Sequence, residues 1–483
     1  MTVLRACLLW AALLASAAAL AQPVSQPTTE PVTQPASQPA SAPTTTQAAS
    51  KPTTTATTTT TTTTQAAKEK DRYLAVINGR VHTVSGPVLE RATVLSKNGV
   101  ITALGPDVVL PPECEVVDAT GLDVYPGLIA AGAGGIHGAS NPQDTTNVYS
   151  LNMLIALAGG ITTALAGNDV AKLTFGSTQD MVVKSNAYVS LTYTTRNPLE
   201  RAQLRADLER VRTYLRDLQK FEREKAAKKD AKPPDKDWLK DKYENYRKLL
   251  QHEATAVTSA PETQELRDIA ELASAYDFAV VVRGAYEGWT VAPLLGRAGV
   301  RAVITPRDDR YPDEHFNRPT GSSIENARIL RDAGVTLAIV PQTPTITLWG
   351  VAGRDLLQLN LEAAFAVRGG LSGEDALRAI TIDAARVLGV DDRVGSLEVG
   401  KDADIIVCDG DLLHYMTLVR YTIVNGRVAY DKSKETLYAH IRPTGQREVP
   451  DFDDQWPRRL QWPEEMQPQR HRDTEKKEPG DKG

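Results

Sequence analysis

The sequence predicts an α/β fold in which a (β/α)8 TIM-like barrel carries a small composite β-domain formed from both of its flanks. Two observations lead to this expectation. Between residues 121 and 400, eight short apolar segments alternate with stretches of helical periodicity, a pattern that favours parallel strands. On either side, at 69–120 and 401–445, short alternating segments are interrupted by Asn-Gly pairs, which are typical of hairpin turns.

The eight candidate barrel strands share a short apolar run that suits a buried strand. They lie at 124–129, 161–165, 181–183, 188–193, 255–258, 278–282, 302–305 and 336–340. An open doubly wound sheet is the alternative, and it would place a glycine-rich phosphate loop after the first strand. Gly132, Gly134 and Gly135 follow that strand, but no helix-starting pattern comes directly after them. The barrel is therefore preferred.

Residues 197–252 form a strongly charged insertion within the barrel. Asn197, Pro198 and Glu200 place a capping residue, a first-turn proline and a third-position acid in the order of a helix start. Apolar residues then recur every three or four positions, as on one face of a helix: Leu204, Leu208, Val211, Leu215 and Leu218. A proline pair at 233–234 precedes a second helical stretch. We expect a helical hairpin that leans on the barrel.

The two ends of the chain have compositions that predict no packed core. Residues 1–21 combine Arg5, an apolar run and a small-residue cleavage site, which is the pattern of a signal peptide. Residues 22–68 are rich in proline and threonine, so we expect a disordered tether. Residues 446–483 form a polar tail. The chain is thus expected to be exported, to the periplasm, the cell surface or the medium, without a membrane span.

Composition excludes several classes of site. The 55 basic and 60 acidic residues nearly balance, so the chain shows no charge pattern for nucleic acid. Three cysteines exclude a zinc site built from cysteine, and Cys114 and Cys408 allow one disulfide at most. The sequence has no Gly-x-Ser-x-Gly elbow, no phosphate loop and no His-Glu-x-x-His helix.

The most specific motifs lie toward the C-terminal end. They read EDALRAIT at 374–381, AARVLG at 384–389 and GSLEVGKDAD at 395–404, with NG at 78–79, VVDA at 116–119 and PGLI at 126–129 near the front. Together, over about 72–430, they resemble the amidohydrolase superfamily, especially its imidazolonepropionase-like and exported members. That resemblance implies a barrel flanked by a small β-domain.

The resemblance also implies metal-assisted hydrolysis of non-peptide carbon–nitrogen bonds at the C-terminal ends of the barrel strands. Zinc and its relatives need about three imidazole, carboxylate or thiolate ligands. The positions that match the family's metal-binding and catalytic residues carry none of these groups: Ala130, Gly132, Gly134, Ser259, Pro261, Arg283 and Gln342. The bridging position of the fourth strand falls at Ser190 or its neighbours. We therefore expect no catalytic residue, no metal and no other cofactor.

Four residues near these strand ends make up the candidate pocket: His137, Arg283, Asp308 and Gln342. His137 lies three residues past the altered motif, in a loop from which it would have to swing inward. Arg283 is a permanent cation. We expect it to pair with Asp308 or Asp309, because an unpaired guanidinium near a barrel mouth is costly. The alternative is that Arg283 binds a carboxylate or other anion in an open pocket.

These observations predict an exported amidohydrolase-family protein that is catalytically degenerate and serves as a structural or regulatory partner. Its expected partners are further copies of the chain or an active amidohydrolase relative, and nucleic acid is not among them. One alternative is an active hydrolase that works through an atypical zinc or other divalent metal site. The other is a protein that binds a small anionic ligand at the barrel mouth.

Overall fold

The computed structural model describes residues 71–138, 140–193, 197–227, 232–346 and 355–434. The predicted signal peptide, tether and polar tail lie outside these residues. No helix in the described part of the chain is both long and apolar enough to cross a lipid bilayer.

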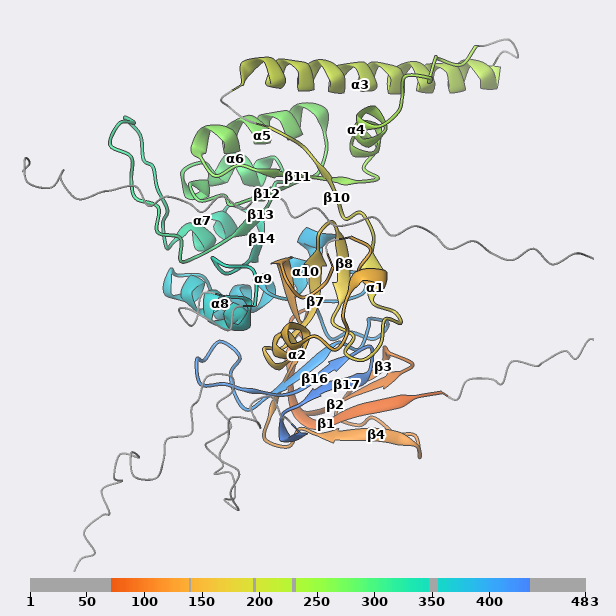
Figure 1. Cartoon of the computed structure of the whole chain (residues 1–483), viewed down its shortest axis with the longest axis vertical. Coiled ribbons are helices and arrows are strands. Elements are labelled where there is room, and N and C mark those ends of the chain that lie inside the picture. The colour runs from red at the N-terminus through yellow and green to blue at the C-terminus, as the bar shows by residue number, and fades with distance from the viewer. Residues whose placement is uncertain (1–70, 139, 194–196, 228–231, 347–354, 435–483) are drawn as a thin grey trace, which may run out of the picture. The chain divides into compact units, whose positions relative to one another are not determined.

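A mixed sheet of eight strands combines two stretches that are far apart in the sequence (Figure 1). Its strands are β1 (Tyr73–His82), β2 (Val88–Lys97), β3 (Val100–Gly105), β4 (Cys114–Asp118), β5 (Asp123–Pro126), β15 (Ile405–Cys408), β16 (Val419–Val424) and β17 (Arg427–Asp431). The order is β17-β16-β15-β5-β1-β2-β3, with β4 parallel to β1. The two stretches meet where β5 runs antiparallel to β15.

Two of the three predicted Asn-Gly turns are present. The pairs at 98–99 and 425–426 connect β2 to β3 and β16 to β17, and both residues of each pair have positive φ. The pair at 78–79 lies instead inside β1, where the register with β2 shifts. A Cβ on Gly79 would lie only 2.4 Å from Cγ2 of Val124. Here the dipeptide allows a β-bulge and a close approach rather than a turn.

The remaining strands form two smaller sheets. One contains β6 (Leu128–Ala133), β7 (Ile161–Ala166), β8 (Asp169–Lys172) and β9 (Val182–Lys184), and the other contains β10 (Tyr188–Ser190), β11 (Thr255–Ser259), β12 (Val280–Arg283), β13 (Arg301–Ile304) and β14 (Thr336–Ile339). All neighbours from β10 to β14 are parallel, as are β6 and β7. In contrast, β7, β8 and β9 pair antiparallel.

The arrangement of these sheets corrects two sequence predictions. The strand expected at 181–183 is part of the antiparallel β8–β9 pair, and the one expected at 124–129 is divided between β5 and β6. Gly134 forms a parallel bridge with Thr345, just beyond β14. No continuous ladder joins the two smaller sheets among the described residues. The structure therefore shows an α/β fold of parallel strands and helices, without showing a closed eight-stranded barrel.

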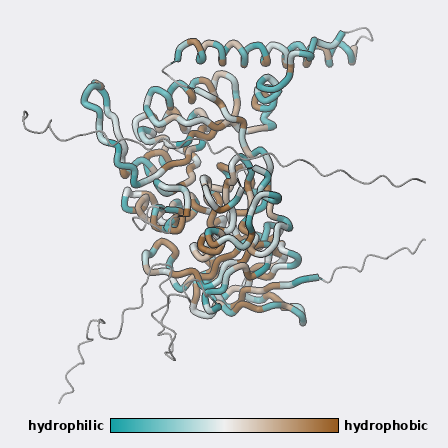
Figure 2. Tube along the Cα trace, viewed as in Figure 1, coloured by the Kyte–Doolittle hydropathy of each residue, from teal (hydrophilic) through white to brown (hydrophobic). Residues whose placement is uncertain are grey.

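The helices alternate with the parallel strands. They are α1 (Pro142–Thr145), α2 (Leu151–Ala158), α3 (Pro198–Ala227), α4 (Lys242–Leu250), α5 (Thr263–Tyr276), α6 (Ala292–Arg297), α7 (Asn326–Asp332), α8 (Leu359–Arg368), α9 (Gly373–Ala379) and α10 (Ile382–Leu388), with single 3-10 turns at Gly288–Thr290, Leu356–Gln358 and Lys432–Lys434. Figure 2 shows hydrophobic residues concentrated along the strands and a largely hydrophilic α3.

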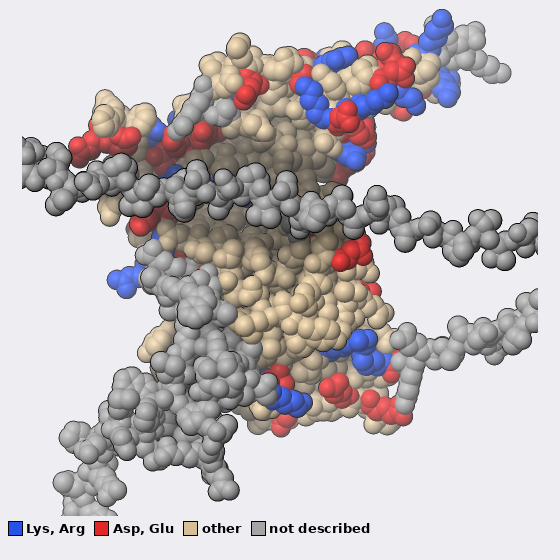
Figure 3. Space-filling model, in the orientation of Figure 1, with Lys and Arg blue, Asp and Glu red and all other residues tan. Residues whose placement is uncertain are grey.

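The charged insertion folds as α3 and α4. Asn197 caps α3 as predicted, because its Oδ1 accepts hydrogen bonds from the backbone N–H groups of Leu199 and Glu200 at 3.2 and 3.3 Å. The apolar face is buried only over its first half: Leu204, Leu208 and Val211 are buried, whereas Leu215 and Leu218 are partly exposed. Side chains of both charges cover the outside of α3 in Figure 3. The helix therefore packs through its N-terminal half.

A compact core lies between the parallel strands and α10. It contains buried side chains from eight strands and from the helix: Ile129, Leu165, Val170, Tyr188, Val257, Val281, Val303, Ala338, Ala384, Val387 and Leu388, among others. Arg301, the first residue of β13, donates a 2.8 Å hydrogen bond to the carbonyl of Arg386 near the end of α10. Since β13 begins at Arg301, α10 lies at the starting ends of the strands. We call the opposite ends of these strands the strand tips.

Candidate functional site

Ser259 and Arg283 lie side by side at the tips of β11 and β12. Side chains alternate along a strand, so these two residues point the same way as Val257 and Val281, which lie one step deeper in the core. They are partners in the parallel register, and both are exposed. The tips of these two strands therefore present a hydroxyl group and a guanidinium group next to each other.

The predicted ion pair of Arg283 with Asp308 or Asp309 is wrong. Asp308 accepts a 3.0 Å hydrogen bond from the backbone N–H of Arg310, and its carboxylate lies 3.7 Å from the guanidinium of the same residue. The turn thus directs Asp308 back toward its own loop. Among the described residues Arg283 has no ion-pair partner, and its guanidinium carbon lies 5.8 Å from the centroid of the Tyr188 ring.

Tyr188 is a site residue that sequence reasoning did not single out, since it named Ser190 or its neighbours. The ring is 5% exposed, and the hydroxyl donates a 2.8 Å hydrogen bond to the carbonyl of Val387 in α10. Burial raises the pKa of Tyr188 well above its usual range. A buried phenol needs such a partner, and only the long-range contact with α10 could have revealed it. Tyr188 fills the space beneath Arg283.

Gly132 and Gly134, at the end of β6, differ in the space around them. A Cβ on Gly132 would lie 3.9 Å from both Val340 and Pro344, which is ordinary van der Waals contact. A Cβ on Gly134 would lie 2.9 Å from Cγ2 of Thr345 and would force that side chain to move. Crowding therefore favours glycine at 134 but does not require it at 132. Ala130, deeper in β6, is fully buried.

The other predicted pocket residues are placed separately. Nδ1 of His137 lies 3.5 Å from the hydroxyl of Thr146, whereas its buried Nε2 has no hydrogen-bond partner. Burial lowers the pKa of His137 to about 4, so the ring is neutral at pH 7. Pro261 accepts a backbone hydrogen bond from Glu287. Gln342 follows β14 and is exposed. His137 thus belongs to its own loop and does not join Arg283.

The donor groups at the strand tips do not fit the divalent metal that the sequence resemblance implies. The described residues contain no group of three or more His, Cys, Asp or Glu side chains that could hold a metal ion. Ser259 and Arg283 offer a hydroxyl and a cation. A guanidinium repels a metal ion, and zinc binds imidazole, thiolate and carboxylate groups. No catalytic step through a metal can be derived from these residues.

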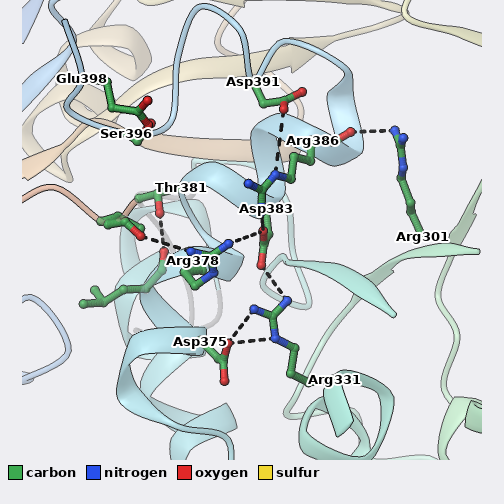
Figure 4. Close-up of polar contacts among 12 residues, drawn as sticks. Arg301, Arg331, Asp375, Arg378, Thr381, Asp383, Arg386, Asp391, Ser396 and Glu398 are labelled. Atoms are coloured by element: carbon green, nitrogen blue, oxygen red, sulfur yellow. Dashed lines mark hydrogen bonds and ion pairs between the residues drawn. The ribbon is translucent and has the colours of Figure 1, made fainter. Parts of the chain in front are cut away.

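A dense polar cluster lies at the starting ends of the strands (Figure 4). The buried carboxylate of Asp383, in α10, lies 2.9, 3.4 and 2.7 Å from Arg331, Arg378 and Arg386. Arg331 also contacts Asp375 at 2.6 Å. We call these five residues the Asp383 cluster. Every cation in it has a carboxylate partner, so its role is to hold α7, α9 and α10 together.

A second buried ion cluster connects β8 to the eight-stranded sheet. Lys172 is completely buried, and its ammonium lies 2.7 Å from Asp402, 3.0 Å from Asp404 and 2.5 Å from Oδ1 of Asn425. Burial raises the pKa of Asp404, although the charge of Lys172 opposes that shift. Sequence reasoning did not find this contact because Lys172 lies more than two hundred residues before its partners and in none of the motifs.

Comparisons with known proteins agree with these motifs. The sequence model of the amidohydrolase family matches residues 317–437. The chain is 47% identical over 62 residues to an imidazolonepropionase of Picrophilus torridus (12% of this chain, 16% of the relative). It is 34% identical over 131 residues to an imidazolonepropionase of Micrococcus luteus (26% and 28%). The chain thus spans less than a third of the length of these relatives.

A solved structure extends the likeness to the fold. An amidohydrolase from Thermotoga maritima has a TM-score of 0.58 and 21% sequence identity to this chain, and the match covers 74% of this chain and all of that one. At that identity the likeness concerns the fold alone. The C-terminal motifs and the match over 317–437 make this part of the chain similar to the amidohydrolase family, and the fold is similar to that of a solved amidohydrolase.

Proposed function

We propose that the chain is an exported member of the superfamily that has lost metal-dependent hydrolysis and acts as a structural or regulatory partner. The observation that carries this proposal is the donor set at the strand tips, where Gly132, Gly134, Ser259 and Arg283 supply no metal ligand. The buried ion pairs of Asp383 and of Lys172 stabilise the fold, which supports a chain that has kept its fold and lost metal-dependent hydrolysis. Export is inferred from the composition of residues 1–68.

We further infer that the parallel strands close into a barrel, as the sequence predicts. The bridge between Gly134 and Thr345 brings the end of β6 next to the segment that follows β14. The packing of α10 against β6, β13 and β14 supplies a base for such a barrel. A barrel needs this contact between its first and last strands.

Metal analysis of the purified chain tests the loss of hydrolysis. We expect zinc, iron and manganese each well below one equivalent per chain. An active imidazolonepropionase, purified in the same buffers, is the control that shows whether the procedure itself removes metal. One tightly bound equivalent in the chain would overturn the proposal and favour an atypical metal site.

The partner role has a test of its own. Light scattering of the purified chain should give a mass of two or more copies, or the chain should form a stable complex with an active amidohydrolase co-expressed from the same genome. A chain that stays monomeric and binds no such relative contradicts a structural or regulatory role.

One observation favours a second function, the binding of a small anion at the strand tips. Arg283 is exposed and has no ion-pair partner among the described residues, and the hydroxyl of Ser259 lies beside it. A guanidinium together with a hydroxyl suits a carboxylate, which accepts hydrogen bonds from both.

Thermal-shift measurements with acetate, malonate and benzoate test this second function. Binding should raise the melting temperature, and Arg283→Gln should abolish the response. Arg310→Gln is the matched control, because Arg310 stacks at 3.7 Å on Tyr286 and pairs with Asp308. A response that survives Arg283→Gln excludes this site.

A further inference from the structure

A cleft away from the strand tips has the features of a second ligand site. It encloses about 370 Å³ between the turns of the eight-stranded sheet and the segment that joins β8 to β9. Its lining includes three arginines, Arg72, Arg393 and Arg427, and two carboxylates, Asp180 and Asp402. We call it the polar cleft. Ligand sites often lie where two parts of a fold meet, and this volume is within their usual range.

The turn that carries Arg427 into the polar cleft is held from several sides. The backbone N–H of Asn425 donates to Asp404 at 2.9 Å, its side-chain N–H donates to the carbonyl of Asp180 at 3.2 Å, and its Oδ1 accepts from Lys172. Its carbonyl accepts a 3.0 Å hydrogen bond from Arg72. Arg427 follows two residues later and therefore starts from a fixed backbone, as a preorganised binding group requires.

The cations of the cleft differ in how they are paired. Arg393 lies 2.8 Å from Asp402, and Arg72 donates to the carbonyl of Asn425. Arg427 is exposed and has no ion-pair partner among the described residues. Its guanidinium is the cation of this cleft that remains available to a ligand.

The charge balance around the cleft is positive. The four cations are the three lining arginines and Lys172 beneath them, and the three anions are Asp180, Asp402 and Asp404. Four positive charges less three negative ones leave one positive charge. This excess favours an anionic ligand, and a single negative charge on the ligand would neutralise it.

The neutral groups of the cleft narrow the class of ligand. Asn98, Ser177 and Gln179 also line it and supply amide and hydroxyl groups, beside the ring of Phe175. The volume is larger than an inorganic phosphate or acetate fills. We propose that the polar cleft binds a small organic anion that carries several hydroxyl groups, such as a sugar phosphate, with its charged group on Arg427.

Isothermal titration calorimetry on the full chain tests the proposal with glucose 6-phosphate as the probe. Glucose and inorganic phosphate, titrated separately, show what the sugar and the phosphate group each contribute. We expect glucose 6-phosphate to bind, phosphate to bind more weakly, and glucose not to bind. Arg427→Gln should weaken the binding of glucose 6-phosphate by about tenfold or more, since a charge-assisted hydrogen bond is lost.

Two further variants control for folding and for the other candidate site. Asp180→Asn removes a negative charge from the lining and should strengthen binding, a gain that a damaged fold would not produce. Arg283→Gln, at the strand tips, should leave the affinity unchanged. The proposal is overturned if glucose 6-phosphate does not bind, if phosphate alone binds as tightly, or if binding survives Arg427→Gln.

Discussion

The starting ends of the parallel strands and their tips use arginine in opposite ways. At the starting ends, Arg331, Arg378 and Arg386 surround one buried carboxylate, that of Asp383. At the tips, Arg283 is exposed and lies over the ring of Tyr188 without an ion-pair partner among the described residues. The first arrangement stabilises the fold, and the second leaves a cation available to solvent or ligand.

The two ends of the strands also differ in how far the match to the amidohydrolase family covers them. The family match at 317–437 contains the whole Asp383 cluster and ends after β17, but Ser259 and Arg283 lie before it. In barrels the tips carry the chemistry and the starting ends carry the stability. The match therefore covers the cluster at the starting ends, and of the predicted strand-tip positions it includes only Gln342.

The largest expected effect is at the starting ends. Asp383→Ala would remove the one buried carboxylate that three guanidinium groups share and should lower the free energy of unfolding by about 3–5 kcal/mol. Urea denaturation measures this loss. Asp391→Ala, on a half-exposed carboxylate 3.9 Å from Arg386, is the control and should cost less than about 1 kcal/mol. Equal losses in the two variants would show that the buried pairing of Asp383 adds nothing beyond an exposed ion pair.

Glu287, which lies near the strand tips, also has a structural role. It therefore allows a second test of the comparison between the tips and the starting ends. Glu287 accepts hydrogen bonds from the N–H and hydroxyl of Thr263, from Gly321 and from Arg318 at 2.7–3.0 Å. Burial alone would raise the pKa of Glu287, but these donors outweigh it and hold the pKa below its usual value. Glu287→Gln should cost about 2 kcal/mol at pH 7.

The sign of the pH dependence follows from that lowered pKa. The contribution of Glu287 is complete above the pKa of the unfolded chain, about 4.3, and is lost as the pH falls through the lower folded value. The difference in unfolding free energy between the wild type and Glu287→Gln should therefore shrink below about pH 4. A difference that is the same at pH 3 and pH 7 would show that these hydrogen bonds do not depend on the charge.

The two glycines of β6 are expected to respond differently. Gly134→Ala places a Cβ 2.9 Å from Thr345 and should cost about 1 kcal/mol or more. Gly132→Ala meets only ordinary contacts and should change the unfolding free energy by less than about 0.5 kcal/mol. Thermal unfolding of both variants compares them directly. A larger loss at 132 would mean that crowding, rather than lost chemistry, fixes glycine there.

A small effect is also expected at Arg283 itself. An exposed cation over an aromatic ring contributes about 0.5–1 kcal/mol at most, so Arg283→Gln should leave the melting temperature almost unchanged. Arg301→Gln is the contrasting variant, because Arg301 donates to the end of α10, and it should lower the melting temperature measurably. A large loss in Arg283→Gln would show that the tip is structural as well.

Local signals were predictable from the sequence, and long-range contacts were not. The cap at Asn197 and the turns at 98–99 and 425–426 have local sequence signals, and the structure contains them. The bulge at 78–79 depends on Val124, which belongs to another strand. The hydrogen bond of Tyr188 and the ion pairs of Lys172 join residues about two hundred positions apart, so no local pattern indicates them.

The candidate site shows the same limit. The assignment of the positions that lack metal ligands comes from motif spacing and stays a prediction. The pairing of Arg283 was predicted wrongly because the turn after Asp308 directs that carboxylate elsewhere. The space at Gly132 and Gly134 depends on Pro344 and Thr345, beyond the last parallel strand. The signal peptide, the tether and the tail lie outside the described residues and stay predictions.

The pairing of β5 with β15 affects how the chain is made. During synthesis β5 emerges early, and the neighbour on its far side begins only at Ile405. Until Ile405 and the residues after it are available, the sheet has an open backbone edge at β5, and such edges recruit other chains. A premature stop codon shortly before that point would therefore yield an aggregating polypeptide rather than a slightly shorter protein.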